Sequence, residues 1–192
     1  MLLDITDFSV IPQPGGKFVQ PVELRYFQGG EERCWEAVKS HDSVSVLLYH
    51  TNRNAFLLVK QFRPPVYMTH SYPYTYELCA GIVDKQVSLE QIIQEEIDEE
   101  CGYAVSPADL ERVGSFFTNV GVTGSRQHLF FATIDDSMKI NDGGGVSNER
   151  IILEFIPLSE ARDFVFDENI AKTPGLMFAF YWYFECYRDN EK

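Results

Sequence analysis

Short apolar runs recur along most of the chain, separated by glycine, asparagine and proline. Runs of this length that are rich in valine, isoleucine and aromatic residues predict β-strands. Two pairs of runs are joined by turn-forming residues and predict β-hairpins, namely 22–27 with 34–38 and 44–49 with 55–62. Further strands are predicted at 76–79, 110–117, 127–134 and 151–157.

One central segment follows the period of a helix instead. It begins at Ser88, whose spacing to Gln91 matches a capping box, and it ends at Gly102, which is well placed for a left-handed C-cap. Helices are also predicted from about Ser159 and from about Pro174. Strands that flank a central helix, with further helices at the end, predict an α/β or α+β fold with a mixed sheet.

The central helix carries acidic residues on its apolar side. At about 100° per residue, the apolar stripe is formed by Leu89, Ile92 and Ile93. Glu96 and Glu100 fall inside this stripe and Glu99 lies at its edge, whereas Glu95 and Asp98 point away. Most runs of acidic residues form a solvated face, but that arrangement would place the glutamates opposite the isoleucines.

Two inward carboxylates one helical turn apart need a compensating charge. Unpaired, they would repel by ~0.2–0.5 kcal/mol even on an open helix surface. Burial would cost several kcal/mol more, or would leave the carboxyl groups protonated. The pattern therefore favours a divalent cation that prefers oxygen ligands.

Composition narrows the choice of partners. The 192 residues carry a formal net charge of −13, which argues against general binding to nucleic acid or to an anionic membrane. Four cysteines without C-x-x-C spacing indicate reduced thiols in a cytoplasmic protein. No basic residue precedes Lys17, so a signal peptide is not expected. The apolar run 176–187 predicts a buried C-terminal helix or a subunit contact.

The loop and helix together resemble the Nudix box. Seven residues match its spacing: Gly81, Glu96, Ile97, Glu99, Glu100, Gly102 and Tyr103. Val87 and Glu95 stand where Nudix hydrolases have a glutamate and an arginine that pair with each other. Because both partners are missing together, neither charge is left stranded, and the metal-binding glutamates remain.

The resemblance extends beyond the box, to the UDP-sugar pyrophosphatase branch of the Nudix hydrolases. It is carried by the segments 41–48, 58–67, 76–84 and 120–127. Enzymes of the ADP-ribose group usually have Ser-Pro-Gly about sixteen residues after the box, where this chain has Asn119-Val120-Gly121. The difference favours UDP-glucose over ADP-ribose as the substrate.

This resemblance implies a three-layer α/β/α sandwich and hydrolysis of UDP-glucose to UMP and glucose 1-phosphate. It also implies Mg²⁺, for which Mn²⁺ can substitute, bound by Glu96, Glu100 and the carbonyl of Ala80. Glu99 is a further ligand or a partner through water. Hydrolysis of ADP-ribose or ADP-glucose, and a Nudix-fold module that binds nucleotide sugars without turnover, remain the alternatives.

Other candidate residues lie outside the box. Arg63 ends an apolar strand and either binds a phosphate or pairs with a surface acid. Glu77 is a candidate carboxylate of the active site, just before the glycine loop. Gly121 and Gly124 allow a close approach of the backbone to an anion, and Arg126 adds positive charge; a plain turn is the alternative.

Two further expectations follow from the resemblance. Related enzymes place a catalytic acid on a loop near Gly143–Gly145, which makes Glu149 the candidate base; a flexible surface loop and a catalytic Glu77 are the alternatives. Residues 1–40 are expected to form N-terminal strands that mediate a homodimer, ahead of a Nudix domain at 41–192. Five aromatic residues there support this view, namely Phe8, Phe18, Tyr26, Phe27 and Trp35.

Overall fold

The computed structural model describes residues 5–12, 14–15, 19–146 and 149–187. The chain divides into two compact units. The N-terminal unit contains the described residues up to Asp42 together with Phe116–Arg126, and the core unit contains Ser43–Ser115 and the residues from Gln127 onward. The segment 116–126 thus belongs to the first unit although it follows much of the second in the sequence.

The N-terminal unit is a three-stranded antiparallel sheet in the order β1 (Ile5–Pro12), β2 (Gln20–Gln28), β3 (Glu31–Lys39). Gly29 and Gly30 join β2 to β3, and both have positive φ, as a tight hairpin turn with the twist of its strands requires. The hairpin predicted at 22–27 and 34–38 is therefore confirmed. The segment 116–126 joins β3 through hydrogen bonds from Val38 N to Val122 O and from Trp35 Nε1 to Gly121 O, both 2.8 Å.

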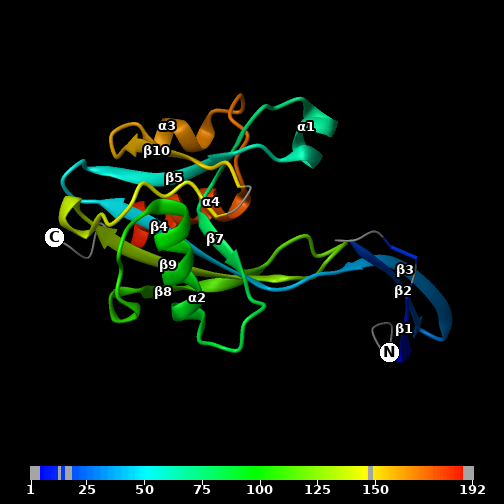
Figure 1. Cartoon of the computed structure of the whole chain (residues 1–192). Helices are drawn as coiled ribbons and strands as arrows, with labels where there is room; N and C mark the ends of the chain where they lie inside the picture. Colours follow the sequence, from blue (N-terminus) through cyan, green and yellow to red (C-terminus); the bar gives the residue numbers. More distant parts are fainter. Residues whose placement is uncertain (1–4, 13, 16–18, 147–148, 188–192) are drawn as a thin grey trace. The chain divides into compact units, whose positions relative to one another are not determined.

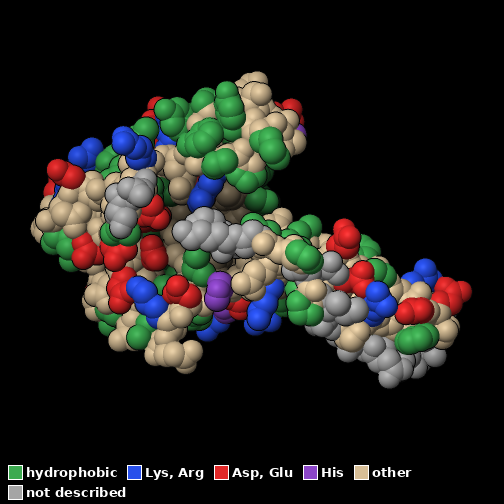
Figure 2. Space-filling view, turned by 45° about the vertical axis from the view of Figure 1, so that its right-hand side comes forward, with side chains coloured by type: hydrophobic (Ala, Val, Ile, Leu, Met, Phe, Trp, Pro, Cys, Tyr) green, Lys and Arg blue, Asp and Glu red, His purple; other side chains and the backbone are tan. Residues whose placement is uncertain are grey.

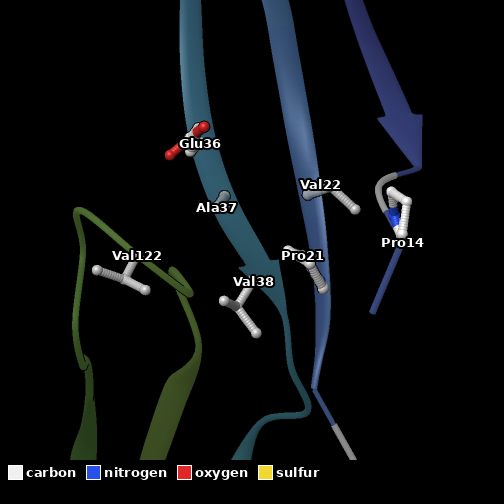
Figure 3. A pocket seen from close by; sticks show the side chains of 7 residues that line it. All are labelled: Pro14, Pro21, Val22, Glu36, Ala37, Val38 and Val122. Carbon is white, nitrogen blue, oxygen red and sulfur yellow. The ribbon is translucent and has the colours of Figure 1, made fainter. Parts of the chain in front are cut away.

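The N-terminal sheet leaves apolar surface exposed. An open pocket of about 450 Å³ is lined by Pro14, Pro21, Val22, Glu36, Ala37, Val38 and Val122. Figure 3 shows these side chains along β2, β3 and the 116–126 segment, with Pro14 just after β1. Trp35 is 51% exposed on the same unit, and none of its described residues form a helix that could cover the sheet.

The core unit is a mixed sheet with helices on both faces (Figure 1). Its strands are β4 (Ser43–His50), β5 (Ala55–Gln61), β6 (Thr75–Glu77), β7 (Cys79–Ile82), β8 (Glu111–Phe117), β9 (Arg126–Ile134) and β10 (Ile152–Pro157). They are ordered β10-β5-β4-β9-β8, and β6 and β7 pair with β5 and β4. Since β4 runs parallel to β9 and antiparallel to β5 and β7, the predicted mixed sheet is confirmed.

The helical elements are α1 (Pro64–His70), α2 (Leu89–Glu96), η1 (Ile97–Cys101), η2 (Pro107–Asp109), η3 (Asp136–Met138), α3 (Ala161–Phe166), α4 (Pro174–Trp182) and η4 (Tyr183–Tyr187). Helix α1 was not predicted: the strand expected to reach residue 62 ends at Gln61, because Pro64 and Pro65 start a helix. None of the helices in the described part of the chain is long and apolar enough to cross a membrane.

Alternation along the strands explains the two covered faces. Val44, Val46 and Leu48 pack on one face in a buried cluster with Ile92 and Ile93 of α2. On the opposite face, the ring of Phe56 lies 4.5 Å from that of Phe180 in α4 and 4.8 Å from that of Tyr183. Full burial of each such side chain stabilises the fold by roughly 1.5–3 kcal/mol. The predicted α/β/α sandwich is therefore confirmed.

The C-terminal helix is buried along one side only. Leu176, Ala179 and Phe180 are fully buried, as the apolar sequence predicted. Tyr181, in contrast, is 61% exposed. The helix therefore packs as a covering layer of the sheet, and its outer side keeps aromatic residues at the surface.

Candidate functional site

The glutamates of interest lie on one continuous helical segment. Helix α2 begins with the predicted capping box: Gln91 N donates to Ser88 Oγ (3.2 Å) and Ser88 N donates to Gln91 Oε1 (3.1 Å). After Glu96 the segment widens into the π-helical turn η1, and Gly102 N donates to Ile97 O at 3.0 Å. Gly102 ends the segment in the left-handed conformation (φ 78°). The extra residue in a π-turn changes how side chains are aimed, and such turns often occur at functional sites.

The two predicted inward glutamates do face inward. Glu100 is only 6% exposed, and its Oε2 accepts a hydrogen bond from Ala80 N at 3.0 Å. Glu96 is half-buried and lies directly over Gly81, where a Cβ would come within 2.1 Å of Glu96 Oε1. Only glycine at position 81 leaves room for that carboxylate, which explains the glycine of the loop.

Burial dominates the electrostatics of this pair. It raises the pKa of Glu96 to about 7, with a further contribution from the charge of Glu99. It also raises the pKa of Glu100 to about 7, although the hydrogen bond from Ala80 N acts in the opposite direction. Both carboxyl groups are thus partly protonated near neutral pH, as expected where the protein itself supplies too little positive charge.

The outward acids have protein partners instead. Glu95 forms an ion pair with Lys85 of the preceding loop, and Asp98 Oδ1 accepts a hydrogen bond from Asn141 Nδ2 at 2.6 Å. Sequence reasoning did not find Lys85 or Asn141, because neither belongs to a recognisable motif. Glu95 stands at the position of the box arginine, and Lys85 of the loop pairs with it. The charges are therefore reversed relative to the Nudix box: the loop carries the cation and the helix carries the acid.

Arg63 and Glu77 form a two-pronged ion pair. Arg63 Nε and a terminal nitrogen donate to the two carboxylate oxygens of Glu77, both at 2.7 Å. Glu77, and more weakly Glu100 and Glu149, raise the pKa of Arg63. The Arg63 side chain remains 48% exposed. The pairing with an acid, left open from the sequence, is therefore present, and the guanidinium group still reaches solvent.

Glu149 belongs to the same electrostatic site. Its negative charge contributes to raising the pKa of both Glu96 and Glu100. Its Oε2 accepts a hydrogen bond from Val146 N at 3.0 Å. The core unit therefore brings together Glu96, Glu99, Glu100, Glu149, Arg63, Glu77 and Ala80, and Figure 2 shows acidic side chains gathered on one face of this unit.

The three remaining candidates belong to the N-terminal unit. Gly121 and Gly124 lie in the turn between β8 and β9, where Gly124 has a positive φ of 62°. Arg126 follows this turn, and its N donates to Asp42 Oδ1 at 2.8 Å. Its guanidinium group lies 4.8 Å from the ring centre of Phe117.

The donor set fits a hard divalent cation that retains water. Within the described ranges, no group of three or more His, Cys, Asp and Glu side chains is arranged to hold a metal ion by itself. Mg²⁺ does not require such a cage, because it commonly binds one or two carboxylates, several waters and substrate phosphates. Half-buried Glu96 and buried Glu100 supply two carboxylates whose raised pKa values a nearby cation would lower.

Known proteins resemble this chain over most of its length. The NUDIX domain family matches residues 39–174. The uridine diphosphate glucose pyrophosphatase of Bos taurus is 37% identical over 198 residues, covering 88% of this chain and 89% of the relative. The GDP-mannose pyrophosphatase of Pectobacterium atrosepticum is 35% identical over 157 residues, covering 81% and 80%. A crystal structure described as an ADP compounds hydrolase shares the fold, with a TM-score of 0.73 at 13% identity and coverage of 98% and 95%.

Proposed function

The chain belongs to the NUDIX domain family, and from this membership we propose that it is a Mg²⁺-dependent hydrolase that cleaves the pyrophosphate bond of nucleoside diphosphate sugars. Its preferred substrate is UDP-glucose, which it converts to UMP and glucose 1-phosphate. The observation that carries the proposal is the inward pair of half-buried Glu96 and buried Glu100 beside Ala80 and Gly81. A non-catalytic protein would have little reason to keep two carboxylates at this energetic cost.

Each residue of the site has a role in this reaction. Glu96, Glu100 and the Ala80 carbonyl would hold Mg²⁺, and Glu99, exposed at the edge, would bind it directly or through water. When bound, the ion supplies neutralisation of phosphate charge and a lower pKa for an attacking water. Glu149 accepts the proton of that water on a carboxylate oxygen.

Arg63 orients the substrate. Its planar guanidinium group suits the geometry of a phosphate, and Glu77 fixes it by occupying one edge. The exposed part of Arg63 remains available to the pyrophosphate. Because both oxygens of Glu77 accept hydrogen bonds from Arg63, we assign the base to Glu149 and the support of Arg63 to Glu77.

We also propose substrate contacts for Gly121, Gly124 and Arg126. Gly121 and Gly124 expose backbone without a side chain, and Arg126 adds a cation. The relatives act, by their names, on UDP-glucose and on GDP-mannose. Since these compounds share the pyrophosphate and differ in base and sugar, we expect a graded preference for UDP-glucose rather than an exclusive one.

A turnover assay with Mg²⁺ tests the proposal. The panel contains UDP-glucose, GDP-mannose, ADP-ribose and ADP-glucose, with ¹⁸O-water as the solvent. We expect UMP and glucose 1-phosphate, with label in one of the two phosphate groups. Formation of UDP and free glucose would contradict cleavage of the pyrophosphate bond, and ¹⁸O label in the glucose would contradict attack at phosphorus. A higher kcat/KM for ADP-ribose would overturn the substrate assignment, and tight binding of the panel without turnover would favour the binding-module alternative.

We also propose a homodimer formed through the N-terminal unit. Its single-layer sheet exposes Trp35 and the apolar pocket that lies beside Val38 and Val122. Exposed apolar surface and open strand edges favour association with a second copy. Of the five aromatic residues noted in the sequence, Phe18 and the Phe8 side chain lie outside the described residues. Light scattering should give about twice the 22.1 kDa monomer mass; a monomer at micromolar concentration would refute the dimer.

The cytoplasm is the proposed location of the enzyme. Support comes from the cysteine pattern, which has no C-x-x-C spacing. Buried Cys79 and Cys101 are free thiols, as this location requires. Fractionation of cells that express the tagged chain at either end would test the location.

A further inference from the structure

We infer that Asn141 is a positioning residue, which fastens the segment 141–145 to the end of the helical segment 89–101 and thereby holds Glu149 at the site of Glu96 and Glu100. We call residues 141–145 the glycine strap. This inference deepens the proposed function and rests on it, because Glu149 needs a fixed position only if it acts in the reaction.

Asn141 joins the helix and the strap through one side chain. Its Nδ2 donates to Asp98 Oδ1 at 2.6 Å and lies 3.4 Å from Asp98 O. Its Oδ1 accepts a hydrogen bond from Gly143 N at 2.7 Å. A single amide therefore bridges the π-helical turn and the first glycine.

The strap also binds the backbone of the site glutamates. Gly144 N donates to Glu100 O at 2.8 Å, and Gly145 N donates to Glu99 O at 3.0 Å. Carbonyl groups in the last turn of a helix lack partners within the helix. The strap supplies these partners, so its backbone position and that of Glu99 and Glu100 are fixed together.

The glycines are required by the closeness of this contact. All three have positive φ, namely 62°, 101° and 86° for Gly143, Gly144 and Gly145. A Cβ at Gly143 would lie 2.4 Å from Glu100 O, and a Cβ at Gly145 would lie 2.7 Å from the Cβ and from Oε2 of Glu149. The three consecutive glycines thus allow a close fit to the helix end, where sequence reasoning had left a flexible loop as the alternative.

The strap continues to the carboxylate of Glu149. Val146 follows directly after Gly145, and its N donates to Glu149 Oε2 at 3.0 Å while Glu149 N donates to Val146 O at 3.1 Å. Glu149 is therefore connected, through Val146 and the strap, to the backbone of Glu99 and Glu100. Displacement of a reacting group by about 1 Å is enough to cost about 100-fold in rate.

A reciprocal exchange of the bridging pair provides the sharpest test. Asn141→Asp places two carboxylates against each other, whereas Asp98→Asn combined with Asn141→Asp restores a donor and an acceptor with the same net charge. Asn169→Ala is the matched control, because Asn169 Nδ2 also donates to an aspartate, Asp167 Oδ1, at 3.0 Å on an exposed turn. Two quantities are measured: the exchange rates of the Gly144 and Gly145 amide hydrogens by NMR, and kcat and KM for UDP-glucose.

We expect Asn141→Asp to speed exchange of both amides by about 10-fold or more and to lower kcat by a similar factor, with little change in KM. The double variant Asp98→Asn/Asn141→Asp should reverse at least half of both changes, the faster amide exchange and the lower kcat, on a logarithmic scale. Asn169→Ala should alter neither quantity. Unchanged amide exchange in Asn141→Asp would overturn the fastening role, and faster exchange with normal kcat would overturn the positioning role. If Asn141→Asp does not fold, the milder variant Asn141→Ala is compared with the double variant Asp98→Asn/Asn141→Asp by the same measurements.

The two proposals fail in different ways. If the wild-type chain hydrolyses no member of the nucleotide-sugar panel, the proposed function is wrong. Slow exchange at Gly144 and Gly145, lost in Asn141→Asp, would still demonstrate the fastening without reference to activity.

Discussion

The two sides of the helical segment 89–101 carry the same kind of residue in opposite environments. On the outer side, Glu95 pairs with Lys85 and Asp98 pairs with Asn141. On the inner side, burial raises the pKa of Glu96 and of Glu100 to about 7, and Ala80 N provides the hydrogen bond to Glu100. The comparison shows that acidic charge alone does not distinguish the two sides of the helix; burial of a carboxylate without a full protein counter-charge does.

The largest expected effect is at Glu100. Glu100→Gln keeps the shape and the hydrogen bond from Ala80 N but removes the charge. We expect kcat to fall by about 100-fold or more at saturating Mg²⁺, because the loss corresponds to several kcal/mol of metal-assisted stabilisation. Steady-state kinetics with UDP-glucose, with circular dichroism to confirm folding, measures this. Near-normal kcat would remove Glu100 from the metal site.

A somewhat smaller effect is expected at Glu149, which lies outside the helix. Glu149→Gln should lower kcat by about 10- to 100-fold and leave KM nearly unchanged, since a base acts mainly in the transition state. A normal kcat in this variant would transfer the role of base to another carboxylate and return Glu77 to consideration.

The third prediction concerns pH and stability. The folded-state pKa values of Glu96 and Glu100, about 7, lie above the usual 4.5, so the protonated forms favour folding. That contribution is complete below about pH 4.5 and is lost as the pH rises through about 7. Mg²⁺ binds the ionised carboxylates and offsets the loss, so it should raise Tm little at about pH 5 and by several degrees at about pH 8.

Calorimetric scans with Mg²⁺ and with a chelator, at each pH, measure this difference. The contributions of other titrating groups to Tm cancel in this difference, because these groups are present in both conditions. The increase at alkaline pH should shrink in Glu100→Gln. An Mg²⁺ effect on Tm that does not depend on pH would contradict the assignment of these two groups.

The smallest effect is expected on the outer side of the helix. Glu95→Gln removes an exposed ion pair, which typically stabilises a protein by about 0–1 kcal/mol. We expect kcat and the affinity for Mg²⁺ to change by less than about threefold. A loss comparable to that of Glu100→Gln would show that the two sides of the helix do not differ in the way we describe.

Local pattern was enough to predict most of this fold. Alternation of apolar residues gave the strands, and Ser88, Gln91 and Gly102 marked the ends of the central helix because capping depends on residues close in sequence. The widened turn at 97–101 was not predictable from this pattern. Its carbonyl groups at Glu99 and Glu100 accept hydrogen bonds from the glycine strap, which comes from a distant part of the chain.

The site was predictable to a similar degree. Helical phase alone identified Glu96 and Glu100 as inward, and the structure agrees. The bonding of Arg63 to Glu77 could not be decided from sequence, since it depends on how β5 and β6 pair. Lys85 and Asn141 were missed for the same reason: each acts through a tertiary contact with the helix and has no motif of its own.

Binding of Mn²⁺, followed by electron paramagnetic resonance, tests the difference between the two sides most directly. Mn²⁺ replaces Mg²⁺ at oxygen ligands and can be observed without substrate or turnover. The wild-type chain and Glu95→Gln should bind Mn²⁺ with similar affinity near pH 8, and Glu100→Gln should bind it at least about 10-fold more weakly. Equal binding by the wild type and Glu100→Gln would contradict the claim that the buried inner carboxylates hold the metal.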